Sequence, residues 1–175
     1  MFNIIKKLLD HNAIDQGELK IKISGFEVNA LCKELISNFR EDAERKKINL
    51  ELQEEVSEIT VYTDKVILYE ILQNLISNAI KFSPENKTVK LRVYSEGNIV
   101  RFEVNDNGPG FSDEDKKKMF NKFARLSAKP TGDEHSTGLG LSIVKKLCEF
   151  INANLKLESK LNEGAKFTIS LKQDN

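Results

Sequence analysis

The sequence predicts an α+β fold in two layers, with amphipathic helices packed against a largely antiparallel sheet. Apolar residues recur at helical spacing in three long segments, and several shorter segments alternate apolar and polar residues as strands do. The length of 175 residues fits one compact domain. A composition of 39% hydrophobic and 31% charged residues is that of a globular chain rather than a disordered one.

The chain begins with a short helical pattern. Residues 1–16 place apolar side chains on one stripe before Gly17, which predicts the end of a helix too short to form a core alone. We expect a short strand over 19–23 and then a long amphipathic helix over 26–46. The side chains expected to face inward from that helix are Val28, Leu31, Leu35 and Phe39.

Two strands and a second long helix follow. Residues 48–53 alternate apolar and polar side chains, and 59–62 form a shorter strand. The second helix is expected over 64–82. It ends before Pro84 because the residue preceding a proline disfavours the helical conformation.

The next elements are a hairpin and a short helix. Strands over 88–94 and 99–105 are joined by a turn at 96–98 that contains glycine. Ser112 begins a short polar helix whose first turn is acidic, which suits the helix dipole.

The last third of the chain contains a loop, a helix and two strands. Residues 124–137 hold proline, glycine and polar side chains without periodicity, so we expect a mobile loop with almost nothing to bury. A third helix over 138–152 precedes strands over 154–159 and 166–171.

Charge and composition exclude several classes of protein. Lysine plus arginine equal aspartate plus glutamate at 27 each, which argues against a general nucleic-acid binder. No apolar run approaches the roughly 18–20 residues of a membrane helix, and residues 1–15 are too charged for a secretion signal. Cys32 and Cys148 lie among apolar residues and are expected to be buried, reduced thiols of a cytoplasmic protein.

The second helix carries a polar stripe of Asn74, Asn78 and Lys81, with Glu70 one turn before it. An ordinary solvated face explains Lys81 and Glu70 but explains the asparagine pair poorly, because asparagine costs helix propensity. Amide oxygens beside a lysine are what a magnesium–phosphate group would use.

Two glycine-containing loops are weak signals singly. Asp106 lies where a strand meets a loop, and Gly108 and Gly110 allow conformations that a side chain would block. Taken alone, this segment is better explained by a simple Asp-Asn-Gly turn. Gly138 and Gly140 precede an apolar helix whose free N–H groups suit an anion, without the pattern of a phosphate-binding loop or a dinucleotide fingerprint.

Taken in order, Asn-x₃-Asn-x₂-Lys-Phe, Asp-x-Gly-x-Gly, Phe-x₂-Phe and Thr-Gly-Leu-Gly-Leu resemble the ATP-binding catalytic domain of two-component sensor histidine kinases. The wider superfamily includes gyrase, mismatch-repair ATPases and the ninety-kilodalton heat-shock chaperone. The resemblance covers about residues 20–172. It implies an α/β sandwich of three helices over a mixed sheet, with ATP between helices and a flexible lid.

The resemblance also implies roles for residues. Asn78 matches the magnesium ligand with Asn74 beside it near the phosphates, and Lys81 matches the phosphate lysine; these three are the expected catalytic residues. Phe82 matches an apolar position close to the adenine, and Asp106 resembles the carboxylate that accepts a hydrogen bond from the adenine amino group. Further nucleotide-binding positions are Gly108 and Gly110 in the adenine wall, Phe120, Phe123 and Arg125 at the base of the lid, and Thr137, Gly138, Leu139, Gly140 and Leu141 in the second glycine motif.

The more important departure from the family pattern concerns the phosphoacceptor. His11 lacks the acidic neighbour and proline of an acceptor motif, and His135 is expected to be a solvated loop residue. Residues 1–18 resemble the end of the preceding dimerisation helix, and 19–175 form the catalytic domain. We therefore expect a monomeric fragment that cannot phosphorylate itself. It would donate phosphate to a histidine on a separate dimerisation domain and so act indirectly on a response regulator.

Two alternatives remain beside the histidine kinase. One is a serine kinase of the anti-sigma-factor type, and the other is a nucleotide-binding docking module without catalysis. Relatives that hydrolyse ATP carry glutamate where this chain has Asn74, so transfer is favoured over hydrolysis. The expected location is the cytoplasm, either as a soluble protein or as the cytoplasmic part of a membrane-bound parent.

Overall fold

A computed structural model describes residues 21–55, 58–121, 124, 126–128, 130–131 and 138–173. The helix expected over 1–16 and the domain boundary after residue 18 lie outside this range. None of the helices in the described part of the chain combines the length and the hydropathy that a membrane crossing requires.

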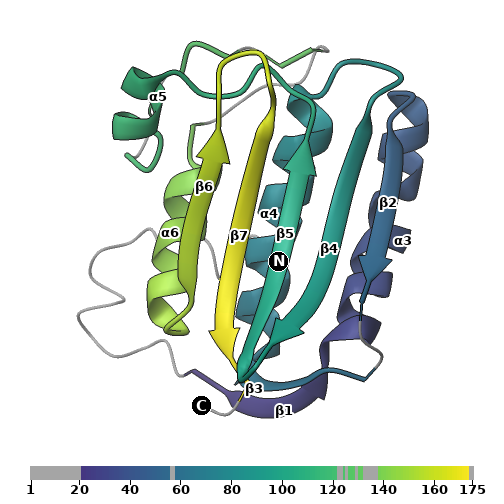
Figure 1. Ribbon diagram of the computed structural model, residues 1–175, viewed down its shortest axis with the longest axis vertical. Coiled ribbons are helices and arrows are strands. Elements are labelled where there is room, and N and C mark those ends of the chain that lie inside the picture. Colours follow the sequence, from purple (N-terminus) through teal and green to yellow (C-terminus); the bar gives the residue numbers. More distant parts are fainter. Residues whose placement is uncertain are drawn as a thin grey trace.

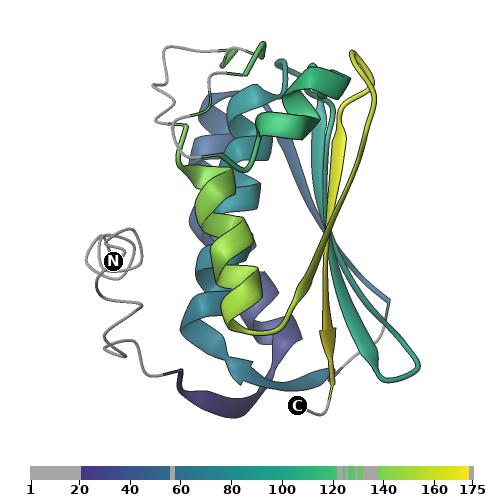
Figure 2. The ribbon, with the colours of Figure 1, turned by 90° about the vertical axis from the view of Figure 1, so that its left-hand side faces the viewer.

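The molecule has two layers, a five-stranded sheet and a layer of helices on one of its faces (Figure 1). The strands are β2 (Asn49–Glu54), β4 (Thr88–Glu96), β5 (Ile99–Asp106), β6 (Asn154–Ser159) and β7 (Ala165–Lys172), and the helices that cover them are α3 (Val28–Arg45), α4 (Lys65–Phe82) and α6 (Gly140–Phe150). The sheet order is β2-β4-β5-β7-β6, with β2 parallel to β4 and every other pair antiparallel. Figure 2 shows all three helices on the same side of the twisted sheet. The predicted fold class is confirmed.

Helix α4 runs along the middle of the helical layer, between α3 and α6 (Figure 1). Its apolar arc is buried, with Leu68, Ile71, Leu72 and Ile76 fully enclosed, and Phe102 of β5 is buried with them in one core. Burying each such side chain stabilises the fold by about 1.5–3 kcal/mol. The polar stripe of α4, with Asn74, Asn78 and Lys81, is therefore not needed for packing the core.

Both ends of α4 are fixed by hydrogen bonds. The Asp64 carboxylate accepts from the backbone N–H groups of Val66 at 3.0 Å and Ile67 at 3.1 Å, which is an N-cap. At the other end, Lys46 Nζ donates to the carbonyls of Ile80 at 2.9 Å and Lys81 at 2.5 Å. These carbonyls lack helical partners, so Lys46 fixes the end of α4 that reaches the functional site.

One predicted element is misplaced. The strand expected over 19–23 is β1 (Ile23–Glu27), and it pairs antiparallel with β3 (Thr60–Asp64) in a separate two-stranded sheet. Phe26 therefore lies in a strand opposite Val61 instead of opening the first long helix. Its ring packs against the core in that position, a tertiary contact that outweighs the helical pattern. Among the described residues, every other expected strand and helix, including the short α5 (Asp113–Lys118), lies within two residues of its observed bounds.

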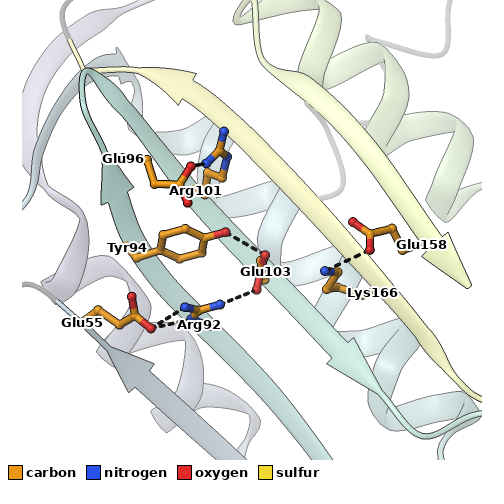
Figure 3. Close-up of polar contacts among 8 residues, drawn as sticks. All are labelled: Glu55, Arg92, Tyr94, Glu96, Arg101, Glu103, Glu158 and Lys166. Carbon is orange, nitrogen blue, oxygen red and sulfur yellow. Dashed lines mark hydrogen bonds and ion pairs between the residues drawn. The ribbon is translucent and has the colours of Figure 1, made fainter.

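The sheet face away from the helices is polar and internally neutralised (Figure 3). Glu103 is only 6% exposed there, and it accepts hydrogen bonds from Tyr94 Oη at 2.8 Å and Arg92 Nη1 at 3.2 Å. Arg92 also pairs with Glu55 at 2.5 Å and lies over the Tyr94 ring, 4.2 Å from its centroid. Further pairs on this face are Arg101–Glu96 and Lys166–Glu158. The charged side chains drawn on this face are therefore paired with one another.

Candidate functional site

A cavity of about 570 Å³ opens between α4, the start of α6, β7 and the loop after β5. Of the residues that the sequence singled out, those lining it are Asn74, Asn78, Lys81, Phe82, Asp106, Gly110, Gly138, Gly140 and Leu141. Segments far apart in the sequence, on two helices and a loop, therefore converge at one place.

The asparagine pair faces the first turn of α6. A Cβ added to Gly140 would lie 3.3 Å from Asn78 Nδ2 and 3.6 Å from Asn74 Oδ1, so a larger residue there would crowd the Asn78 amide. Asn74 Nδ2 donates to the Glu70 carbonyl at 2.8 Å, which leaves its Oδ1 as the free acceptor. The solvated-face interpretation is wrong for Glu70, which is 4% exposed and whose pKa is raised by burial.

The free N–H groups of α6 form the other side of this region. Leu139 occupies the N-cap and supplies no side-chain hydrogen bond to the first turn, and Gly138 has a φ of 67°. Unsatisfied N–H groups and the helix dipole favour an anion at this point. The asparagine amides and the start of α6 therefore offer acceptors and donors to one ligand.

Asp106 ends β5 and is held by the backbone around it. Its Oδ1 accepts hydrogen bonds from Gly108 N at 2.8 Å and Ala165 N at 3.2 Å. No residue in the described part of the chain donates to its Oδ2. Burial raises the pKa of Asp106, and the two backbone hydrogen bonds oppose that rise. The carboxylate is thus fixed by one oxygen, and the other can accept from a ligand.

Other ionisable groups near the core are unsuited to metal binding or nucleophilic chemistry. The described residues contain no cluster of three or more histidine, cysteine, aspartate or glutamate side chains that could hold a metal ion. Cys32 and Cys148 are buried as expected, and burial raises the pKa of both thiols to about 12. They stay protonated near neutral pH and are unreactive.

Over residues 63–175 the chain matches the family of histidine kinase-, DNA gyrase B- and HSP90-like ATPases. The chain belongs to this ATPase family. Its relatives include the circadian input-output histidine kinase CikA of Synechococcus elongatus, 31% identical over 97% of this chain and 23% of that protein. The sensor protein KdpD of Clostridium acetobutylicum is 28% identical over 99% of this chain and 19% of that protein. The chain thus spans about a quarter or less of these relatives' length.

Solved histidine kinase catalytic domains share the fold. The nucleotide-free catalytic domain of ThkA has a TM-score of 0.76 at 25% identity and covers 87% of this chain and 97% of that one. Full-length ShkA in complex with AMPPNP has the same TM-score and identity, over 87% of this chain and 31% of that one. The sequence resemblance to sensor histidine kinase catalytic domains is therefore confirmed.

Several predicted residues of this ATPase domain lie elsewhere than in the cavity wall. Gly108 donates its backbone N–H to Asp106. Phe120 packs against the core, with the Lys145 ammonium over its ring, and Leu139 packs against the core at the start of α6. The positions of Phe123, Arg125 and Thr137, like those of His11 and His135, lie outside the described residues.

Much of the apolar wall was not predicted from the sequence. Phe111 and Phe167 meet edge to face with their centroids 5.9 Å apart, joining the loop after Asp106 to β7. Nothing in the local pattern links two residues so distant along the chain. Leu75 and Ala79 follow the asparagines directly on α4, and they are buried in the core as well as lining the cavity. The remaining unpredicted wall residues are Pro109, Met119, Ala124, Leu126, Ala128 and Ala165.

We expect Gly110→Ala to lower the free energy of unfolding by about 1–3 kcal/mol or more. Gly110 has a φ of 66°, and a Cβ there would lie 2.0 Å from the Lys160 carbonyl oxygen. Gly97→Ala is a matched control, because its φ is 59° and nothing lies within 4 Å of the added Cβ. Urea unfolding measures both free energies, and equal losses would show that the approach of Lys160 contributes nothing.

Proposed function

We propose that this chain binds magnesium–ATP in the cavity and donates the γ-phosphoryl group to a histidine on a separate dimerisation and phosphoacceptor domain. The observation that carries the proposal is the convergence of Asn74, Asn78 and Lys81 with the start of α6 and with Asp106 around one space. Phosphoryl transfer asks a protein mainly for positioning and charge neutralisation, and this set supplies both.

The residues present suit a magnesium ion and a phosphate chain. Asn78 would hold the ion through its amide oxygen, with Asn74 beside it, since magnesium favours one or two protein oxygens with its remaining ligands from water and phosphate. When bound, the ion would neutralise phosphate charge. Lys81 and the free N–H groups at the start of α6 would stabilise the same charge.

Asp106 gives the site a means of recognising adenine. A ligand amino group would donate to its Oδ2, while Oδ1 stays engaged with the backbone. The apolar side chains around it, Phe82, Phe111 and Phe167, suit a flat base. The nucleotide would thus lie with its base toward Asp106 and its phosphates toward Asn78.

The site favours transfer to a protein over hydrolysis. Asp106 is the one carboxylate among the described residues that line the cavity, and it is assigned to the base. Asn74 is an amide and cannot accept a proton from water. Without a general base near the phosphates, hydrolysis loses about 10²–10⁴-fold in rate.

The length of the relatives supports the proposed partners. CikA and KdpD are several times longer than this chain. In this proposal the acceptor histidine lies on a dimerisation domain of the parent kinase, and a response regulator receives the phosphoryl group in the next transfer. The proposed location is the cytoplasm. The isolated chain would be a monomer.

We expect Asn78→Ala to weaken magnesium–ATP binding by about tenfold or more, because an amide contact to a charged group is lost. Calorimetry with magnesium and with chelator tests this, and the loss should shrink in chelator. Ser77→Ala, an exposed neighbour on α4, serves as the control and should bind as the wild type does. Unchanged affinity in Asn78→Ala would contradict the assignment, and an unfolded variant would make Asn78 structural.

A further inference from the structure

Part of the cavity wall is attached to α5 by a buried carboxylate. Leu126 and Ala128 line the cavity, and Ser127 lies between them with its side chain exposed. Ser127 N donates to Asp115 Oδ1 at 3.1 Å, and Ser127 Oγ donates to Asp115 Oδ2. Asp115 is 1% exposed, so these hydrogen bonds provide partners for a buried carboxylate.

Asp115 occupies an unusual position for this contact. It is in the first turn of α5, where Ser112 Oγ accepts from its backbone N–H at 3.1 Å. In a capping box the acid at this position reaches back to the backbone N–H of the N-cap residue. Here the Ser112 hydroxyl donates to the carboxylate at 3.0 Å and Lys118 Nζ lies 3.8 Å from its Oδ1, while both carboxylate oxygens also accept from Ser127, 12 residues away. The Ser127 hydroxyl is also the main cause that lowers the pKa of Asp115.

A second attachment lies further along the same segment. The Thr131 N–H donates to the Lys81 carbonyl at 3.2 Å, and Thr131 Oγ1 lies 2.9 Å from the Ser83 carbonyl. The described residues of 126–131 are therefore held to α5 at one end and to the end of α4 at the other. The expectation that this loop has almost nothing to bury is wrong for Leu126, which packs against the core.

We propose that Asp115 is a positioning residue for nucleotide binding, which holds Leu126 and Ala128 in the cavity wall before a ligand arrives. The proposal rests on the nucleotide-binding function proposed above. A ligand that meets an ordered wall does not bear the entropic cost of ordering it. Asp115 itself contacts no part of the cavity and acts through Ser127.

The test uses variants that differ in one hydroxyl. Ser127→Val and Ser127→Thr have nearly the same shape at an exposed position, and only threonine can donate to Asp115. We expect Ser127→Val and Asp115→Asn to weaken ADP binding by about 3- to 10-fold in calorimetry. Ser127→Thr should stay within about twofold of the wild type, as should Asp113→Asn, a 92% exposed acid in the same turn of α5. The double variant of Asp115 and Ser127 should bind no worse than the weaker single variant.

A second measurement needs no nucleotide. Hydrogen exchange of the Ser127 amide should accelerate in Ser127→Val and Asp115→Asn and stay slow in Ser127→Thr. Failure of the wild type to bind ADP would overturn the nucleotide-binding function and the proposal with it. Binding by the wild type with equal affinities in the valine and threonine variants would overturn the positioning role alone. If Asp115→Asn does not fold, the Ser127 pair still decides.

Discussion

A separate domain that carries an acceptor histidine is expected to become phosphorylated when it is mixed with this chain and magnesium–ATP. The chain alone should neither label itself nor hydrolyse ATP at an appreciable rate. Its His11 lacks the acidic neighbour and proline of an acceptor motif. Asn74 offers an amide where a hydrolytic enzyme needs a base, which costs about 10²–10⁴-fold in hydrolysis.

The assay follows label from γ-labelled ATP. Label on the added domain should be labile in acid and stable in base, and its rate should rise with that domain's concentration. Stable label on this chain that survives in His11→Ala would contradict the prediction. Acid-stable label on serine would favour the anti-sigma-factor type of kinase, and nucleotide binding without transfer would favour a docking module.

Asp106→Ala is expected to abolish most of the affinity for ATP. A ligand amino group left without its acceptor costs about 1–3 kcal/mol, which is about 5- to 150-fold in affinity. The backbone N–H groups of Gly108 and Ala165 lose their acceptor in the same variant. The adenine wall should loosen as well, so the measured loss should lie at the upper end of that range.

Asp106→Asn separates recognition of the base from support of the loop. With its oxygen toward Gly108 and Ala165, the asparagine keeps both backbone hydrogen bonds but turns an NH₂ group toward the ligand's amino group. The variant should fold normally, bind ATP weakly and lose the preference for ATP over inosine triphosphate, which has a carbonyl oxygen in place of the amino group. Calorimetry with both nucleotides measures this. Equal affinity for ATP in the wild type and Asp106→Ala would exclude the role.

The titration of Asp106 gives the same prediction a pH dependence. Burial raises the pKa of this carboxyl, so it becomes protonated at a higher pH than an exposed aspartate does as the pH falls. The ability of Asp106 to accept a hydrogen bond from the ligand should therefore decline as the pH falls through that higher range. ADP affinity measured against pH should fall earlier in the wild type than in Asp106→Asn, which has no group to titrate there.

Local pattern was enough to predict most of the fold. The apolar period of α4 and the proline after its end predicted the helix within one residue. The hairpin of β4 and β5 followed from alternation and a glycine turn. The polar stripe of Asn74 and Asn78 was visible for the same reason, because helical spacing places residues four apart on one side.

Tertiary structure decided the features that depend on residues far apart in the chain. Phe26 forms part of β1 because its partner strand and a core position are available, which its own neighbours do not reveal. One backbone hydrogen bond to Asp106 comes from Ala165, far along the chain. The hydrogen bond from Ser127 to Asp115 joins two segments that share no hydrophobic periodicity. Periodicity reports which side of an element is apolar. Which polar groups meet across the cavity depends on how the layers close, and only the folded chain determines that.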